Sequence, residues 1–256
     1  MKKIIILFAM TFLFTGLNGQ VEIIAHRGAS YLAPENTVAS TRLGFELEAD
    51  AVEVDIYLTA DNKIVCIHDA NTKRTTGADH VIKESSSKVL RTLDAGSWKA
   101  AEYKGEKIPF LQEVILAVPK GKRLVVEIKC KSEVLPMLKK MVGKYLKNRD
   151  FTFIAFDFQT IIDTKKAFPD NPCHWLCSNK ELFEKNLPLV PGSGIDGVSL
   201  SYGLIDEQVA KSVKDLNLEL YTWTVDDVAE AQRLISLGVK GITTNRPGWL
   251  REQVFR

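Results

Sequence analysis

The chain has 256 residues, of which 45% are hydrophobic and 26% are charged. This composition is ordinary for a globular protein and allows one domain, or two small ones, around a large core. The formal net charge is +2, so there is no basic surplus that would attract nucleic acid or an anionic membrane surface. We therefore expect a small-molecule partner.

Residues 1–19 have the composition of a secretory signal peptide. The basic start MKK is followed by an uncharged apolar run of 14 residues, IIILFAMTFLFTGL, and the segment ends in small and polar residues at Gly19. A membrane-spanning helix needs about 20 apolar residues, so cleavage is favoured over an uncleaved anchor. We expect a periplasmic or secreted protein, no stable membrane insertion after cleavage, and a folded domain at residues 20–256. Its net charge would be 0, because Lys2 and Lys3 leave with the signal.

Beyond residue 20, short runs rich in β-branched and aromatic residues alternate with longer segments of helical periodicity. Eight runs are predicted strands, at residues 21–25, 51–58, 123–129, 151–156, 173–177, 196–201, 218–225 and 241–244. The helical segments lie at residues 35–49, 132–146, 158–168, 206–216 and 227–238. Asn36 is a candidate N-cap of the first helix, and Gly238 is placed to end the last. Eight strands alternating with helices predict an α/β fold, the (β/α)8 TIM barrel, with an open doubly wound sheet as the alternative.

One interval between predicted strands is longer than the others. After the turn residues ADN, the segment KIVCIHD at 63–69 predicts a hairpin strand that returns beside the second predicted strand. The following residues, 71–110, are polar and interrupted by glycine, with too few apolar residues for a core of their own. We expect a small insertion after the second strand that lies over the top of the barrel.

Four cysteines in an exported chain raise the question of disulfides. Cys173 and Cys177 lie in CHWLC, a predicted strand, where the rise over four residues is about 13 Å, beyond disulfide reach. Cys66 and Cys130 lie in or beside other apolar runs. Small buried thiols are therefore expected, in preference to a bridge or a zinc site.

Acidic side chains lie at the ends of two predicted strands that would be adjacent. Residues two apart in a strand point to the same side, which pairs Glu53 with Asp55 in EVD and Glu127 with Lys129 in EIK. Three carboxylates so close together repel one another unless a cation compensates them, and carboxylate oxygens are the ligands that Mg²⁺ and Ca²⁺ prefer. A divalent metal site is one interpretation. The other is a Glu127–Lys129 ion pair beside solvated Glu53 and Asp55.

Two of the four histidines would reach the same rim of the barrel. His26 and Arg27 follow the first predicted strand, and His68 ends the hairpin strand; the other two histidines are expected in a polar loop and at the core edge. One imidazole can take a proton from an attacking hydroxyl while the other gives one to the departing oxygen. Arg27 offers a planar fork to an oxyanion such as phosphate. These residues suit phosphodiester cleavage, with Gly28 letting the backbone turn close to the ligand.

The order of these motifs resembles the glycerophosphodiester phosphodiesterase family. HRG at 26–28 is followed by PENT, by ExD at 53–55, by HD at 68–69 and by ExK at 127–129. The similarity continues through RTTG, LDAGSW and IPFLQEV to the late Trp and TNRP. Any one motif is weak evidence, but their ordered combination over nearly the whole mature chain is specific.

The resemblance implies a TIM-barrel hydrolase that needs a divalent cation, Mg²⁺ or Ca²⁺, and cuts deacylated phospholipids into glycerol 3-phosphate and an alcohol. It implies acid and base roles for His26 and His68, metal binding by Glu53, Asp55 and Glu127, phosphate contacts from Arg27 and Lys129, and an apolar wall for the glycerol end at Trp223.

Two further motifs are interpreted as structural. Glu35 and Asn36 in PENT are interpreted as a helix start. Where the family often has Asp, this chain has Asn245, which keeps the size and some hydrogen bonding but not the charge. We therefore leave Asn245 out of the predicted site.

Other functions use the same fold. A phospholipase acting on intact lipid would be expected to expose an apolar or basic rim, of which the neutral mature charge gives little sign. A secreted barrel that only binds phosphodiesters has no need of both histidines and all three acids. A glycoside hydrolase needs two separated carboxyl groups and has no use for the histidine pair or Arg27.

Overall fold

The structure is a computed structural model that describes residues 20–145 and 149–255. In these residues the strands form one sheet. The predicted signal at 1–19 lies outside these residues. The strands are β1 (Glu22–Ala25), β2 (Ala51–Leu58), β3 (Ile64–Cys66), β4 (Arg123–Ile128), β5 (Asp150–Ala155), β6 (Cys173–Cys177), β7 (Gly197–Ser201), β8 (Glu219–Trp223) and β9 (Gly241–Thr244). They lie in the order β1-β9-β8-β7-β6-β5-β4-β2-β3, and β1 also pairs with β2.

Pairing of β1 with β2 closes the sheet into a barrel. Ile24 lies opposite Ala51 and Ala25 opposite Val52, and β1 pairs with β9 on its other side. All pairs along the barrel are parallel, whereas β3 is antiparallel to β2. The predicted TIM barrel and the predicted hairpin are therefore confirmed, and the open sheet is excluded. The eight predicted barrel strands agree with the observed ones to within two residues at each end, whereas the predicted hairpin strand at 63–69 extends three residues beyond the end of β3.

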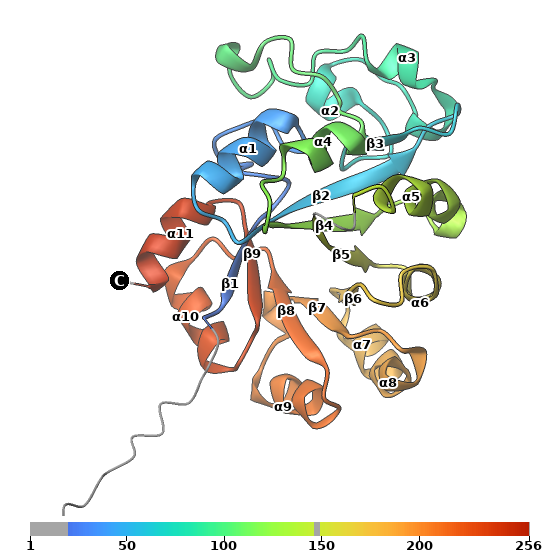
Figure 1. Ribbon diagram of the computed structural model, residues 1–256. Coiled ribbons are helices and arrows are strands. Elements are labelled where there is room, and N and C mark those ends of the chain that lie inside the picture. The colour runs from blue at the N-terminus through green and yellow to red at the C-terminus, as the bar shows by residue number, and fades with distance from the viewer. Residues whose placement is uncertain (1–19, 146–148, 256) are drawn as a thin grey trace, which may run out of the picture.

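Helices surround the barrel strands (Figure 1). They are α1 (Val38–Glu46), α2 (Lys73–Thr76), α3 (Ser87–Leu90), α4 (Leu111–Ala117), α5 (Leu135–Val142), α6 (Phe158–Ala167), α7 (Lys180–Asn186), α8 (Val190–Ser193), α9 (Glu207–Asp215), α10 (Val228–Ser236) and α11 (Pro247–Val254). Short 3-10 helices lie at Ile82–Glu84, Ala101–Tyr103, Ser132–Val134, Leu187–Leu189 and Tyr202–Leu204. The predicted helical segments correspond to α1, α5, α6, α9 and α10.

Local signals explain the ends of two of these helices. The N-cap of α1 is Thr37, whose side chain accepts a hydrogen bond from the Ser40 N–H at 3.1 Å. The prediction of Asn36 as the N-cap is therefore wrong by one residue. Gly238 has a φ of 86° just after α10, which is the left-handed conformation expected of a glycine that ends a helix.

Alternation along β2 and β4 directs acidic side chains into the barrel. Ala51 packs in a cluster inside the barrel, and Val52 belongs to the larger core between strands and helices. The same alternation turns Glu53 and Asp55 inward. In the parallel register Asp55 lies opposite Glu127 of β4. These acids lie toward the carboxyl ends of their strands, the end at which TIM barrels carry their active sites.

The insertion after β2 builds a small apolar cluster together with β3. It carries α2 and α3, which lie above β2 and β3 in the view of Figure 1. The cluster buries two residues of the hairpin and four of the insertion, namely Val65, Ile67, Ile82, Leu90, Ala95 and Ile108. The insertion thus shares an apolar cluster with the hairpin strand, which agrees with the expectation that it has no core of its own. A backbone bridge between Val65 and Phe110 ties its last residues back to β3.

The cysteines are free thiols, as expected. Cys66, Cys173 and Cys177 are buried and Cys130 is partly buried, and burial raises the pKa of each thiol. Within residues 20–145 and 149–255, no helix has both the length and the apolar character needed to cross a bilayer.

Candidate active site

Three carboxylates meet at the carboxyl ends of β2 and β4. Glu53, Asp55 and Glu127 are only 2%, 1% and 9% exposed, and one oxygen from each lies within 4.8 Å of the others. Oε1 of Glu53 and Oδ1 of Asp55 are buried and accept no hydrogen bond from the described residues. A buried carboxylate oxygen without a partner is costly. A coordinated cation would supply the missing partner.

The electrostatics of this triad also fit a cation. Burial, followed by repulsion from Asp55 and Glu127, raises the pKa of Glu53 well above its ordinary value. Burial, followed by repulsion from Asp55, raises the pKa of Glu127 to about 7. Without a cation these acids hold protons that a bound metal would displace. Oxygen ligands from three acids suit Mg²⁺ or Ca²⁺, so the residues fit the group that the resemblance implies.

Lys129 lies beside the triad. Its Nζ is 2.9 Å from Glu127 Oε1 and 3.7 Å from Asp55 Oδ1. The ion pair of the alternative interpretation therefore exists, but Glu53 and Asp55 next to it are buried, not solvated. Lys129 also lines the central pocket, where its ammonium group can reach an anion.

Arg27 joins the triad through both its backbone and its side chain. It has a φ of 53°, and in this left-handed conformation its N–H donates to Glu53 Oε2 at 2.8 Å. Its guanidinium donates to Glu35 Oε1 at 2.9 Å, and its Nε lies 3.4 Å from Asp55 Oδ2. One residue thus orients one predicted metal ligand and contacts another.

The segment between β1 and α1 serves the site directly. A Cβ on Gly28 would come within 2.6 Å of Ser40 in α1, so this glycine allows close packing of the helix. Its φ of 81° agrees with the expected backbone turn, and closeness of this turn to a ligand stays a prediction. Asn36 donates from Nδ2 to Asp55 Oδ2 at 2.8 Å and accepts from the Asp55 N–H at 2.9 Å. Glu35 accepts from two arginines. The interpretation of Glu35 and Asn36 as a mere helix start is therefore wrong.

His26 is held by an amide whose orientation is fixed. Asn245 donates from Nδ2 to Asp226 Oδ2 at 2.6 Å, because a carboxylate can only accept. Its Oδ1 therefore faces Ser30 Oγ at 3.0 Å and His26 Nδ1 at 2.7 Å. His26 consequently carries its proton on Nδ1. Burial, then the charge of Arg27, lowers the pKa of His26 to about 4, so the ring is neutral near pH 7. Asn245 lies outside the predicted set of site residues, but the hydrogen bonding that its amide retains is what holds His26.

His68 is held by a carboxylate. Its Nδ1 lies 2.7 Å from Asp69 Oδ1, and the other Asp69 oxygen, Oδ2, accepts from Arg74 Nε at 2.6 Å. His26 is held by a neutral amide, whereas His68 is held by a negatively charged carboxylate. The two imidazoles of the site thus stand in different electrostatic environments.

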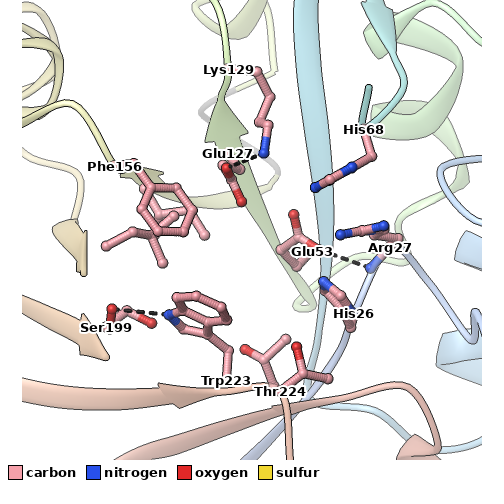
Figure 2. Close-up of a pocket in the computed structure, with 13 residues that line it drawn as sticks. His26, Arg27, Glu53, His68, Glu127, Lys129, Phe156, Ser199, Trp223 and Thr224 are labelled. Carbon is pink, nitrogen blue, oxygen red and sulfur yellow. Dashed lines mark hydrogen bonds and ion pairs between the residues drawn. The ribbon is translucent and has the colours of Figure 1, made fainter. Parts of the chain in front are cut away.

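The site residues surround one cavity of about 120 Å³. Figure 2 shows His26, His68 and Arg27 on one side of Glu53, and an aromatic wall of Phe156 and Trp223 on the other. The two rings of this wall meet edge to face, 5.4 Å apart. The indole N–H of Trp223 donates to the Ser199 carbonyl at 3.1 Å, which fixes the apolar face of the ring toward the cavity. Phe156 was not predicted as a site residue. It is the last residue of the predicted strand at 151–156, and a large apolar side chain at the carboxyl end of a barrel strand could have indicated a wall of the pocket.

The structure thus brings together the sequence-predicted site residues, His26, Arg27, Glu53, Asp55, His68, Glu127, Lys129 and Trp223, at one barrel rim. His174 lies elsewhere, 2% exposed and stacked on Tyr221 with ring centroids 4.6 Å apart. His80 lies in the insertion, where its N–H donates to Thr72.

Clustered buried carboxylates, two of them with an oxygen that accepts no hydrogen bond, lie beside imidazoles and cationic side chains at the carboxyl rim of a TIM barrel. This is what a metal-assisted phosphodiesterase requires. Comparison with known proteins agrees with this class. The sequence profile of the glycerophosphoryl diester phosphodiesterase family matches residues 26–249, and the chain belongs to this family. It is therefore an enzyme of this type, as the resemblance implied.

Two relatives and one solved structure illustrate the similarity. A glycerophosphodiester phosphodiesterase of Caldanaerobacter subterraneus is 32% identical over 88% of this chain and 94% of its own. One of Bacillus subtilis is 28% identical over 88% of this chain and 83% of its own. The structure of an Oleispira antarctica phosphodiesterase in complex with the product sn-glycerol-3-phosphate superposes with a TM-score of 0.81 and 26% identity, covering 92% of this chain and 97% of that one.

Proposed function

We propose that this enzyme uses a divalent cation and two histidines to hydrolyse glycerophosphodiesters to glycerol 3-phosphate and an alcohol. The observation that carries the proposal is the meeting of two differently held imidazoles with three buried carboxylates, two of which have an oxygen without a hydrogen-bond partner, at one barrel rim. The complex of the Oleispira antarctica enzyme with glycerol 3-phosphate supports the choice of product.

His26 is the base in this proposal. Its Nδ1 proton is committed to Asn245, and its pKa of about 4 keeps the ring neutral. The free Nε2 lone pair can therefore take a proton from the attacking hydroxyl. His68 is the acid in this proposal, because Asp69 orients its ring through Nδ1 and leaves Nε2 free to deliver a proton to the departing oxygen.

The remaining residues hold the substrate and the cation. Glu53, Asp55 and Glu127 would bind Mg²⁺ or Ca²⁺, which when bound supplies positive charge against the charge that develops on the phosphate. Arg27 and Lys129 contribute further positive charge at the pocket. Trp223, with Phe156 beside it, offers an apolar surface to the carbon chain of the glycerol.

An assay of glycerol 3-phosphate release tests the proposal directly. Residues 20–256 would be incubated with glycerophosphocholine, glycerophosphoethanolamine and glycerophosphoinositol, and with the corresponding intact phospholipids in vesicles. We expect release from the deacylated substrates in the presence of Mg²⁺ or Ca²⁺. Cleavage of intact lipid alone would indicate a phospholipase, and binding without turnover would indicate a non-catalytic barrel.

The Asn245–His26 contact predicts a change in pH dependence. Asn245→Asp places a carboxyl oxygen 2.7 Å from Nδ1 and a second one 2.6 Å from Asp226, where the amide donor is lost. The negative charge of this carboxyl pair increases and favours the positively charged ring. The pKa of His26 should rise, and a base works only above its pKa. The acidic limb of the kcat/KM profile should therefore move to higher pH, by about one unit or more, with activity lost first at low pH. An acidic limb that stays in place would contradict the role of His26 as the base.

We also propose that residues 1–19 direct export, since a basic start and an uncharged apolar run precede the barrel. Mass spectrometry of the protein recovered from outside the cytoplasm would test this. Removal of the first 19 residues is expected, and recovery of the full chain only from the cytoplasm would contradict it.

A further inference from the structure

We propose that Arg74, contributed by the insertion, is a positioning residue that locks Arg27 and His68 into one geometry; this rests on the function proposed above. Arg74 lies in α2, outside the barrel proper. It contacts two carboxylates, Glu35 and Asp69, each of which holds a different residue of the site.

The contacts form one continuous chain of alternating charge. Arg74 donates from NH1 and NH2 to the two oxygens of Glu35, at 2.8 and 2.7 Å. Its third donor, Nε, reaches Asp69 at 2.6 Å. Glu35 in turn accepts from Arg27 at 2.9 Å, and Asp69 pairs with His68 at 2.7 Å. The guanidinium therefore connects the phosphate-binding side of the pocket to the predicted acid.

The exposed fractions of the two side chains show that Glu35 depends on Arg74 for its charged state. The Glu35 side chain is only 10% exposed, whereas that of Arg74 is 44% exposed. Burial alone would raise the pKa of Glu35, but hydrogen bonds and charge from Arg74, and then from Arg27, lower it below its ordinary value. Glu35 is thus an ionised acceptor shared by two arginines.

Loss of Arg74 would free both ends of this chain. Glu35 would keep Arg27 as its one remaining charged partner, and could draw that guanidinium away from the pocket. Asp69 would lose the donor that fixes its second oxygen, and so would hold His68 less rigidly. A guanidinium is required at this position. Its donors lie on three separate nitrogens in a fixed plane, whereas the three donors of an ammonium group share one nitrogen and cannot reach both Glu35 oxygens and Asp69 in the same geometry.

Arg74→Met is the primary test, with Lys73→Met as the matched control. Lys73 is the neighbouring residue of α2, is 69% exposed and pairs only loosely with Asp79, at 3.7 Å. We expect Arg74→Met to lower kcat/KM by about 10- to 100-fold, through a higher KM as well as a lower kcat. The affinity for glycerol 3-phosphate, measured by calorimetry, should weaken in parallel. Lys73→Met should match the wild type in kcat/KM and Tm. Arg74→Met should remain folded at the assay temperature, with a lower Tm because Glu35 loses two hydrogen bonds.

Two further variants separate positioning from charge and from folding. Arg74→Lys retains the charge but should behave like Arg74→Met. Combining Arg74→Met with Glu35→Gln should cost far less than the product of the two single losses, because both changes break the same chain. Multiplied losses, or rescue by lysine, would overturn the proposal. So would an Arg74→Met enzyme that equals the Lys73→Met control while the wild type is active. A wild type that releases no glycerol 3-phosphate would instead refute the proposed function.

Discussion

Replacement of either His26 or His68 by alanine is expected to lower kcat by about 10²- to 10⁴-fold and to leave the fold intact. His26→Ala removes the group that takes the proton, and His68→Ala removes the group that delivers one. Neither ring belongs to the hydrophobic core. Steady-state kinetics of the purified variants, with glycerol 3-phosphate release as the readout, would measure the loss.

His80→Ala provides the control for the histidine variants. His80 lies in the insertion, and its hydrogen bonds to Thr72 are made by its backbone, whose N–H donates to Thr72 Oγ1 and whose carbonyl accepts from the Thr72 N–H. Its replacement should leave kcat unchanged. If His26→Ala and His68→Ala both retained the kcat of the His80→Ala enzyme, acid–base catalysis by this pair would be excluded.

Removal of the divalent cation is expected to abolish turnover and to make stability depend on pH. Below about pH 7 Glu127 is protonated in the metal-free enzyme, so protons compete with the cation and its affinity should rise as pH rises. The folded pKa lies above the ordinary value of 4.5, so the native state binds more protons than the unfolded state between these values. The metal-free enzyme should therefore lose stability as pH rises through this window.

Calorimetric scans with EDTA, or with Mg²⁺ or Ca²⁺, would measure this linkage. The Tm of the metal-free enzyme should fall between about pH 5 and about pH 7, and the cation should raise Tm most at the upper end. Glu127→Gln should flatten the dependence, whereas Glu181→Gln, at an exposed position of α7, should not. Full turnover in EDTA would reject the need for a metal.

The position of the triad was predictable because a strand has a period of two. Ala51 and Glu53 point into the barrel for the same geometrical reason, and any parallel barrel brings β2 and β4 together at the same rim once the hairpin strand β3 is set aside. Local sequence therefore contained the information about Glu53, Asp55 and Glu127.

Contacts made through loops were not predictable in this way. Asn36 reaches Asp55 because its backbone is left-handed, with a φ of 58°. The residues around Asn36 instead favoured its interpretation as a helix cap. Asn245 depends on Asp226, which fixes its amide. Arg74 was visible within RTTG, but only the folded insertion brings it to Glu35.

Local features also explain why some helices were not predicted from periodicity. α4 and α7 span only seven residues each, too few to establish a helical period. α11 begins with Pro247 in its first turn, a position that proline favours. From the sequence alone, however, a proline is equally typical of a loop.

The most direct test of the account is to locate a bound cation. Crystals of residues 20–256 soaked in Mn²⁺, a substitute for Mg²⁺ with an anomalous signal, should give one strong peak within about 2.5 Å of oxygens from Glu53, Asp55 and Glu127. That peak should be absent from Glu53→Gln crystals. An active enzyme with no peak among these three acids, or with its cation bound elsewhere, would contradict the account.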